Sequence, residues 1–156
     1  MKLFILAVGN KMPKWVDDGF ADYAMRMSQE VTIELLKIKP EKRSKNIKIS
    51  QLLCAEAKRI HAVLPPKCRT IVMDESGRHW STVKLADSIS SWMRNGGDTA
   101  FIIGGADGLD LEIKKSADEV LALSALTLPH GLVRVLLAEQ LYRAVSLIKQ
   151  HPYHRK

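Results

Sequence analysis

The chain has 156 residues, the size of one domain. Hydrophobic residues make up 46% of it and charged residues 26%, a composition that excludes a disordered chain. Two cysteines without a CxxC pair exclude a disulfide scaffold and a zinc ribbon. No run approaches the roughly 18 apolar residues of a membrane span, and no cleavage site follows the apolar start of the chain. We therefore expect a cytoplasmic protein with no membrane contact.

Strand patterns and helix patterns alternate along the chain. In chain order we expect a strand over 2–8, a helix over 13–28, a strand over 31–38, a helix over 49–64, a strand over 70–73, a helix over 82–95, a strand over 100–103, a helix over 110–117, a strand over 120–123 and a helix over 132–150. This alternation, with apolar central strands, predicts an α/β sandwich with a mostly parallel sheet and a single domain over 1–156.

Three segments follow strands, where parallel sheets bind ligands: Asp74–Gly77, Gly104–Gly108 and Ser124–Gly131. The first has the chemistry of a turn. Glycines in the second let backbone approach a ligand closely, and we expect a side chain at Gly104 to collide with that ligand or to require a forbidden φ. A tight turn that merely needs glycine is the alternative. The segment lacks the dinucleotide fingerprint and the Walker lysine.

The third segment, with Leu123 before it, is nearly uncharged, yet Pro129 and Gly131 keep it from joining the last helix smoothly. We expect such an apolar loop to be buried, so that its backbone groups need partners. Those partners are either other protein groups or the edge of a flat ligand such as adenine.

A basic stretch sets the net charge of +7. Opposed only by Glu41, it contains Lys37, Lys39, Lys42, Arg43, Lys45 and Lys48. Such a cluster favours a polyanion such as RNA. A solvated surface loop without a partner is the alternative.

The last predicted helix is apolar on two faces, which predicts a subunit interface. It also carries Arg134, Glu139 and Arg143, the last two spaced as an ordinary helical ion pair. The tail from His151 contains imidazole, phenol and guanidinium groups. An ordinary frayed chain end is the alternative interpretation. Its HxxH pattern has no third ligand, so we expect no metal site.

These residues have a family resemblance. IGGADG, LSALTLPHGLVRVLLAEQLYRA, the terminal HPYHRK and the N-terminal AVGNKMPKWVDDGFADY resemble the SPOUT-class methyltransferases, more narrowly the RlmH type, which methylates N3 of a pseudouridine in 23S rRNA. The similarity covers essentially the whole chain. Ala106 stands where many members carry proline, and the position of Asp107 varies among them. We expect neither side chain to matter to a site built from backbone.

The resemblance implies a SPOUT-type α/β sandwich with a C-terminal trefoil knot. It further implies a homodimer, S-adenosyl-L-methionine as cofactor and assembled ribosomes as the source of the acceptor. The cofactor-binding residues that it implies are Met73, Gly104, Leu123, Ser124, Ala125, Leu126, Thr127 and Leu128. With the basic stretch, the expected RNA contacts are Lys42, Arg43, Lys45 and Arg143.

The acceptor chemistry restricts the catalytic candidates. A uracil-type N3–H is an imide, so a base or a cation that stabilises the developing anion is needed. The candidates are His130, Arg134, Glu139, Tyr153, His154 and Arg155. The histidines and the glutamate are possible bases, the arginines orient phosphate or stabilise the anion, and the tyrosine stacks on the base. The sequence does not select the base. A non-catalytic RNA-binding module and a nucleotide-binding enzyme of another kind are the competing interpretations.

Overall fold

A computed structural model describes residues 1–153. The elements, in chain order, are β1 (Lys2–Val8), α1 (Lys14–Met25), β2 (Thr32–Ile38), α2 (Ile49–Val63), β3 (Arg69–His79), α3 (Thr82–Asn95), β4 (Thr99–Ile103), α4 (Leu111–Ser116), β5 (Glu119–Ala122) and α5 (His130–Ile148). Each predicted strand and helix is present. The end signals act as expected in α3, where the Ser81 hydroxyl accepts a hydrogen bond from the Lys84 N–H and Gly96 ends the helix with φ of 73°.

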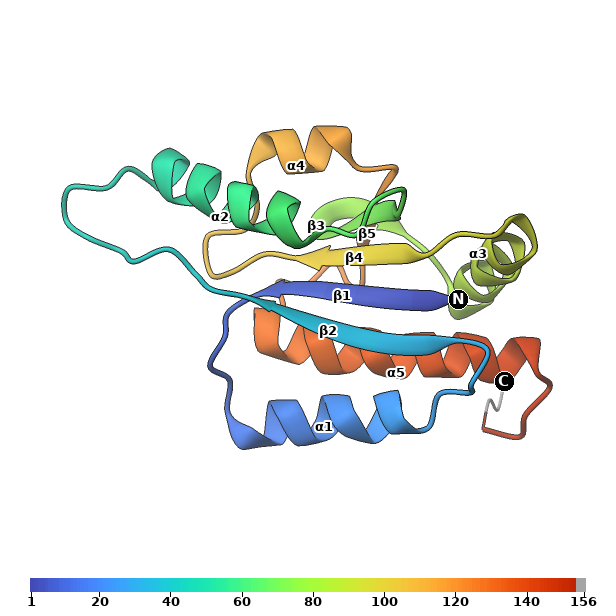
Figure 1. Ribbon diagram of the computed structural model, residues 1–156. Helices are drawn as coiled ribbons and strands as arrows, with labels where there is room; N and C mark the ends of the chain where they lie inside the picture. The colour runs from blue at the N-terminus through green and yellow to red at the C-terminus, as the bar shows by residue number, and fades with distance from the viewer. Residues whose placement is uncertain (154–156) are drawn as a thin grey trace.

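The strands form one parallel sheet in the order β2-β1-β4-β3-β5. Helices cover both faces (Figure 1). One hydrophobic core joins the sheet to α1, α3 and α5, and a second joins it to α2 and α4. The predicted α/β sandwich is confirmed. The trefoil knot stays a prediction. Within residues 1–153, no helix is long and apolar enough to cross a membrane.

The turn predicted at Asp74–Gly77 is wrong, because this segment lies inside the long strand β3. The pairing of β3 with β5 shifts register between Met73 and Arg78 and then resumes. At this irregularity the two backbones approach closely, since a Cβ on Gly77 would lie 2.6 Å from the carbonyl carbon of Leu121. The turn-forming residues therefore make a bulge in the strand.

The two apolar faces of α5 have a different explanation from the expected one. The helix packs against the sheet with Leu137 and Leu141 fully buried, and it contacts both α1 and α3. Its own chain therefore covers most of its apolar surface. The part left toward solvent includes Leu132, which is partly exposed, and Leu136, which is 36% exposed. The homodimer stays a prediction.

Candidate active site

The three segments predicted to follow strands do converge. They line one cavity of about 920 Å³ at the carboxyl ends of β3, β4 and β5. Of the predicted cofactor residues, those that line it are Met73, Gly104, Leu123, Ser124, Leu126, Thr127 and Leu128. Ala125 belongs to the same loop but does not line the cavity.

Side chains from the β3 bulge fasten the loops around this cavity. The Thr127 hydroxyl donates to Glu75 Oε2 at 2.6 Å, and Lys114 Nζ lies 2.7 Å from Asp74 Oδ2. Burial raises the pKa of the Asp74 carboxyl, but hydrogen bonds from Lys114 and Ser76 outweigh it and hold the pKa below its usual value. Sequence reasoning assigned no role to these acids, because nothing in the pattern indicates which distant residues they contact.

The glycine loop itself leaves no room for a side chain at Gly104. A Cβ at this position would lie 2.6 Å from the carbonyl oxygen of Gly108 and 2.9 Å from Leu109 Cγ. The collision is therefore with the glycine loop itself, and φ at Gly104 is not in the left-handed region. Tight packing of the loop on itself excludes a side chain here, and collision with a ligand stays a prediction.

The loop over 123–128 is not buried as predicted. Leu126 is 74% exposed, and Ala125 and Thr127 are also exposed. The loop extends beyond β5 with the cavity on one side, and its own chain does not cover the tip. An apolar side chain so exposed beside a large cavity is a place where a ligand or a second chain gains hydrophobic contact.

His130 and Arg134, the first two catalytic candidates, lie at the start of α5 in different surroundings. His130 lines the cavity, and its buried Nδ1 has no hydrogen-bond partner within residues 1–153. Burial and the neighbouring Arg134 lower the pKa of its imidazole, which favours the neutral form.

Arg134 does not line the cavity. It is fully buried and donates to the carbonyl oxygens of Val8 at 3.2 Å and Gly9 at 2.7 Å. Burial lowers the pKa of the guanidinium. The predicted contact with RNA phosphate does not fit this position, because a side chain without exposed surface cannot reach a polyanion. Arg134 instead holds the end of β1 against α5.

The remaining described candidates form a cluster further along α5. Arg143 Nε donates to Glu139 Oε1 at 2.8 Å, and the Tyr153 hydroxyl donates to the same oxygen at 3.2 Å. The Tyr153 ring lies 4.6 Å from the Tyr142 ring and 5.0 Å from the Arg143 guanidinium. Burial, with Tyr23 and Glu139, raises the pKa of Tyr153 to about 12. The hydrogen bond to Glu139 raises the pKa of Arg143.

The cluster and the cavity lie apart. The cluster begins at Glu139, nine residues after His130, which is about 13 Å farther along the axis of α5. The end of α5 lies at the opposite side of the molecule from the carboxyl ends of the strands (Figure 1). The structure therefore splits the predicted catalytic residues into two groups. His154 and Arg155 lie outside the described residues.

The predicted RNA loop is attached to the cofactor loop. Arg43 forms an ion pair with Asp107, whose side chain is 19% exposed. The Asp107 side chain therefore joins the two loops, and its importance to the site stays a question for experiment. Lys42, Arg43 and Lys45 are all exposed, and Arg43 is the one that is paired with Asp107.

The base of this loop is fixed on α2. The Glu41 N–H donates to Glu56 Oε2 at 3.0 Å, and Arg59 donates to Glu41 Oε2 at 2.9 Å and to the Lys39 carbonyl at 2.8 Å. Glu56 is 5% exposed, and burial raises the pKa of its carboxyl. Sequence reasoning missed Glu56, since a glutamate on a helix is usually solvated. In residues 1–153, no three His, Cys, Asp or Glu side chains come together as a metal site.

Comparisons with known proteins agree with these features. A family model described as "Predicted SPOUT methyltransferase" matches residues 1–154. The chain is 65% identical over 155 residues to "Ribosomal RNA large subunit methyltransferase H" of Nitrosospira multiformis, covering 99% of each chain. It is 54% identical to the protein of the same name from Chromobacterium violaceum, covering 100% of both.

Solved structures share the fold at low identity. A probable methylase family protein from Haemophilus influenzae aligns with a TM-score of 0.56 and 15% identity, covering 99% of this chain and 70% of that one. A probable methyltransferase from Bordetella pertussis aligns with a TM-score of 0.56 and 13% identity, covering 92% and 95%. At such identities the likeness concerns the fold alone.

Proposed function

The chain belongs to the family of SPOUT methyltransferases, and we propose that it transfers a methyl group from S-adenosyl-L-methionine to N3 of a pseudouridine in 23S rRNA, on assembled ribosomes in the cytoplasm. The observation that carries the proposal is the convergence of three loops on one large cavity at the carboxyl ends of the strands. The names of relatives that cover nearly the full chain support the rRNA substrate. On the same grounds, residues 1–156 form one domain with a knotted C-terminal part.

The cavity suits this cofactor. Leu126 offers exposed apolar surface for a flat ring, and the unpartnered Nδ1 of His130 offers a polar atom inside the same cavity. The residues that would hold the cofactor are those that line the cavity: Met73, Gly104, Leu123, Ser124, Leu126, Thr127 and Leu128. When bound, the cofactor supplies an electrophilic methyl group on a sulfonium sulfur.

The protein must in turn make N3 of the acceptor pseudouridine nucleophilic. The imide proton has to leave before or during methyl transfer, which a base at the cavity or a cation that stabilises the developing anion would promote. Of the described candidates, His130 lines the cavity of its own chain, and its lowered pKa keeps it neutral and able to accept a proton at pH 7. Glu139 and Arg143 do not line the cavity of their own chain, and we propose that they serve the cavity of a second chain.

The site is therefore proposed to be shared between the two chains of a homodimer. The surface of α5 that includes Leu132 and Leu136 is left toward solvent, and Glu139 and Arg143 follow farther along the helix. Two copies packed antiparallel along this surface would bring Arg143 and Tyr153 of one chain toward the His130 end of the other. The distance from cavity to tail within one chain is the reason for assigning the tail to the partner's site.

Two experiments test the activity. Equilibrium dialysis with labelled S-adenosylmethionine separates a methyltransferase from a non-catalytic RNA-binding module, which would bind RNA and leave the cofactor free. Mass analysis of rRNA from a deletion strain should then show one pseudouridine without its N3-methyl group. Unchanged rRNA modification in that strain would refute the proposed reaction.

A mixed dimer tests the shared site. One chain carries Gly104→Val and the other lacks residues 151–156, so each homodimer should be inactive. In the mixed dimer, the intact tail of the first chain serves the intact cavity of the second, and about half of the normal activity is expected if the sites are independent. An assembled mixed dimer without activity would show that each tail serves its own chain.

A further inference from the structure

A second cavity lies outside the candidate active site, between β3, β5 and α3. Its volume is about 350 Å³, and Trp80 and Trp92 contribute to its lining. Their ring centroids are 6.5 Å apart, with the planes tilted by 39°. Trp92 is 7% exposed, whereas Trp80 is only partly buried. Trp80 therefore presents the more accessible aromatic surface of this cavity.

The acidic side chains of the cavity are engaged with their own chain. Asp118 Oδ2 accepts hydrogen bonds from the Thr70 N–H at 2.7 Å and from the Thr70 hydroxyl at 3.1 Å. Glu119 pairs with Arg78 at 3.8 Å. The lining therefore has three basic side chains against two carboxylates, and Arg69 and Lys84 are the basic side chains not paired with these acids.

Two cations lie over the tryptophan rings. The Lys84 ammonium is 5.6 Å from the Trp80 centroid, and the Arg69 guanidinium is 5.1 Å from the Trp92 centroid. At partly exposed sites, contacts of this kind are weak enough for a flexible side chain such as Lys84 to exchange the ring for a phosphate. An accessible indole with a movable cation beside it is the arrangement with which proteins bind unpaired nucleotides.

Given the proposed RNA substrate, we infer that this cavity binds one unstacked nucleotide of that RNA, with the base on Trp80 and the phosphate contacted by Lys84 and Arg69. Single-stranded RNA supplies the bases for such stacking, whereas a duplex keeps them inside. An acidic peptide would use the cations but would leave the indole without a flat partner.

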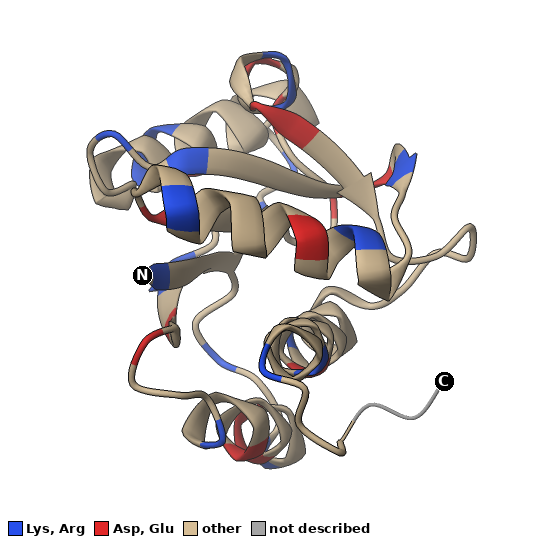
Figure 2. Ribbon diagram, turned by 90° about the vertical axis from the view of Figure 1, so that its right-hand side faces the viewer, with Lys and Arg blue, Asp and Glu red and all other residues tan. Residues whose placement is uncertain are grey.

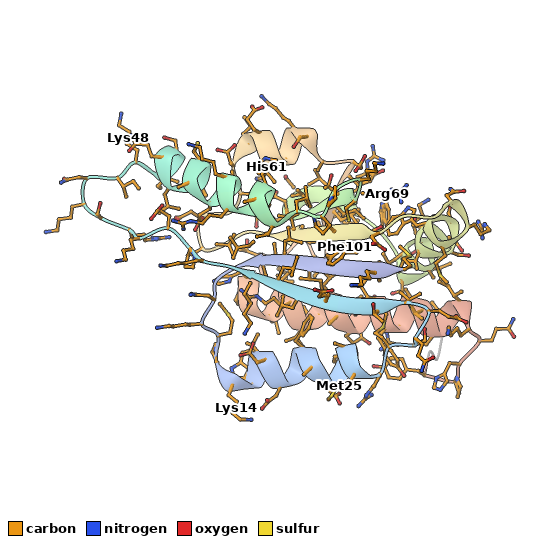
Figure 3. The ribbon with its side chains drawn as sticks, in the orientation of Figure 1. Lys14, Met25, Lys48, His61, Arg69 and Phe101 are labelled. Atoms are coloured by element: carbon orange, nitrogen blue, oxygen red, sulfur yellow. The ribbon has the colours of Figure 1, made fainter. Side chains whose placement is uncertain are left out.

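The position of the cavity suits an RNA that also enters the active site. Arg69 lies at the end of the sheet away from Lys48 and the basic loop (Figure 3), at the end of the molecule that Figure 2 views. Along β3 it precedes Met73, which lines the active-site cavity, by four residues, or about 13 Å. A short single strand can span this distance, so the two cavities can hold nucleotides of one RNA segment.

The test uses binding of a labelled hexauridylate, followed by fluorescence anisotropy without S-adenosylmethionine. Trp80→Leu should weaken binding about tenfold, because one stacked base is lost. Trp15→Leu is the matched control, since Trp15 is 58% exposed on α1, away from this cavity, and its removal should leave the affinity unchanged.

A second pair of variants protects the test against misfolding, because Trp80 packs partly against the core. Lys84→Gln should weaken binding several-fold and reduce its salt dependence. Lys115→Gln removes the same charge from α4 and should change neither. If Trp80→Leu and Lys84→Gln bind the oligonucleotide as the wild type does, the inference is wrong. If polyglutamate displaced the labelled hexauridylate as well as unlabelled hexauridylate does, the inference would also be wrong, because charge alone would then explain binding.

Methylation kinetics separate this inference from the proposed function. With assembled ribosomes as substrate, Trp80→Leu should raise KM and leave kcat unchanged, since the cavity lies away from the reacting atoms. An active wild type with no change of KM in Trp80→Leu would overturn the nucleotide site alone. Inactive wild-type protein that still binds the oligonucleotide through Trp80 would overturn methyl transfer and support the nucleotide site.

Discussion

Replacing Gly104 by alanine tests whether the glycine loop must pack on itself before it can bind a cofactor. The added Cβ would lie 2.6 Å from the Gly108 carbonyl oxygen, whereas ordinary contact begins at 3.4 Å. The loop must therefore open by about 0.8 Å, and overpacking of this kind costs about 1–3 kcal/mol. For a chain of 156 residues that corresponds to a decrease in Tm of about 3–9 °C.

The same displacement should impair cofactor binding. A loop shifted by nearly an ångström misplaces its ligand contacts, so calorimetric titration should show at least about tenfold weaker S-adenosylmethionine binding. Gly105→Ala is the matched control, because its Cβ would meet only Val8 Cγ1 at 3.2 Å, and a small shift of that side chain relieves the contact. Unchanged Tm together with unchanged affinity in Gly104→Ala would refute the reasoning. Lost affinity at unchanged Tm would instead indicate collision with the cofactor.

Three further predictions concern charged groups. Replacing Lys42 and Lys45 with alanine should reduce the slope of log affinity for RNA against log salt by about 1.5 and leave cofactor affinity unchanged. An unchanged slope would show that the loop is a solvated surface without an RNA contact. Arg43→Gln and Asp107→Asn should each weaken S-adenosylmethionine binding by up to about fivefold, and the double variant no further, because one exposed ion pair is lost; additive effects would contradict a direct pair. His130 has a folded-state pKa below its unfolded value, so its contribution to stability is present above pH 6.5 and is lost as the pH falls through the folded pKa. His130→Asn should therefore flatten the decrease of Tm between pH 7 and pH 5, and an equally steep decrease would exclude His130 as its source.

Periodicity and end signals predicted the layers of the fold because they reflect local physics. A strand such as β4 is fully buried and apolar after its first residue, Thr99, and α3 has both its N-cap serine and its terminal glycine. The bulge in β3 was mistaken for a turn because Asp, Ser and Gly favour tight backbone in either setting. Only the resumed pairing of Arg78 with Leu121, which depends on a distant strand, distinguishes the two.

The site was predictable in its backbone and not in its side-chain partners. Parallel strands deliver their following loops to one edge, so the convergence of the three loops follows from topology. The contacts of Arg43 with Asp107 and of Thr127 with Glu75 join residues 64 and 52 positions apart, and no local pattern contains them. Arg134 shows the same limit, because an arginine on a helix gives no indication that it will be buried against the end of β1.

The two expectations about burial, at the loop 123–128 and at α5, rest on one assumption. The loop over 123–128 was expected to be covered and is exposed, whereas α5 was expected to need a second chain and is largely covered by α1 and α3. Both expectations took apolar sequence as evidence of burial without knowing which surface of this chain supplies the cover. The apolar surface left over lies at Leu126 and at Leu136, on the cavity loop and on the outer side of α5. A homodimer that covers Leu136 and carries the tail of one chain to the partner's cavity would account for both exposures, because Tyr153 contacts its own chain at Glu139, about 13 Å along α5 from His130.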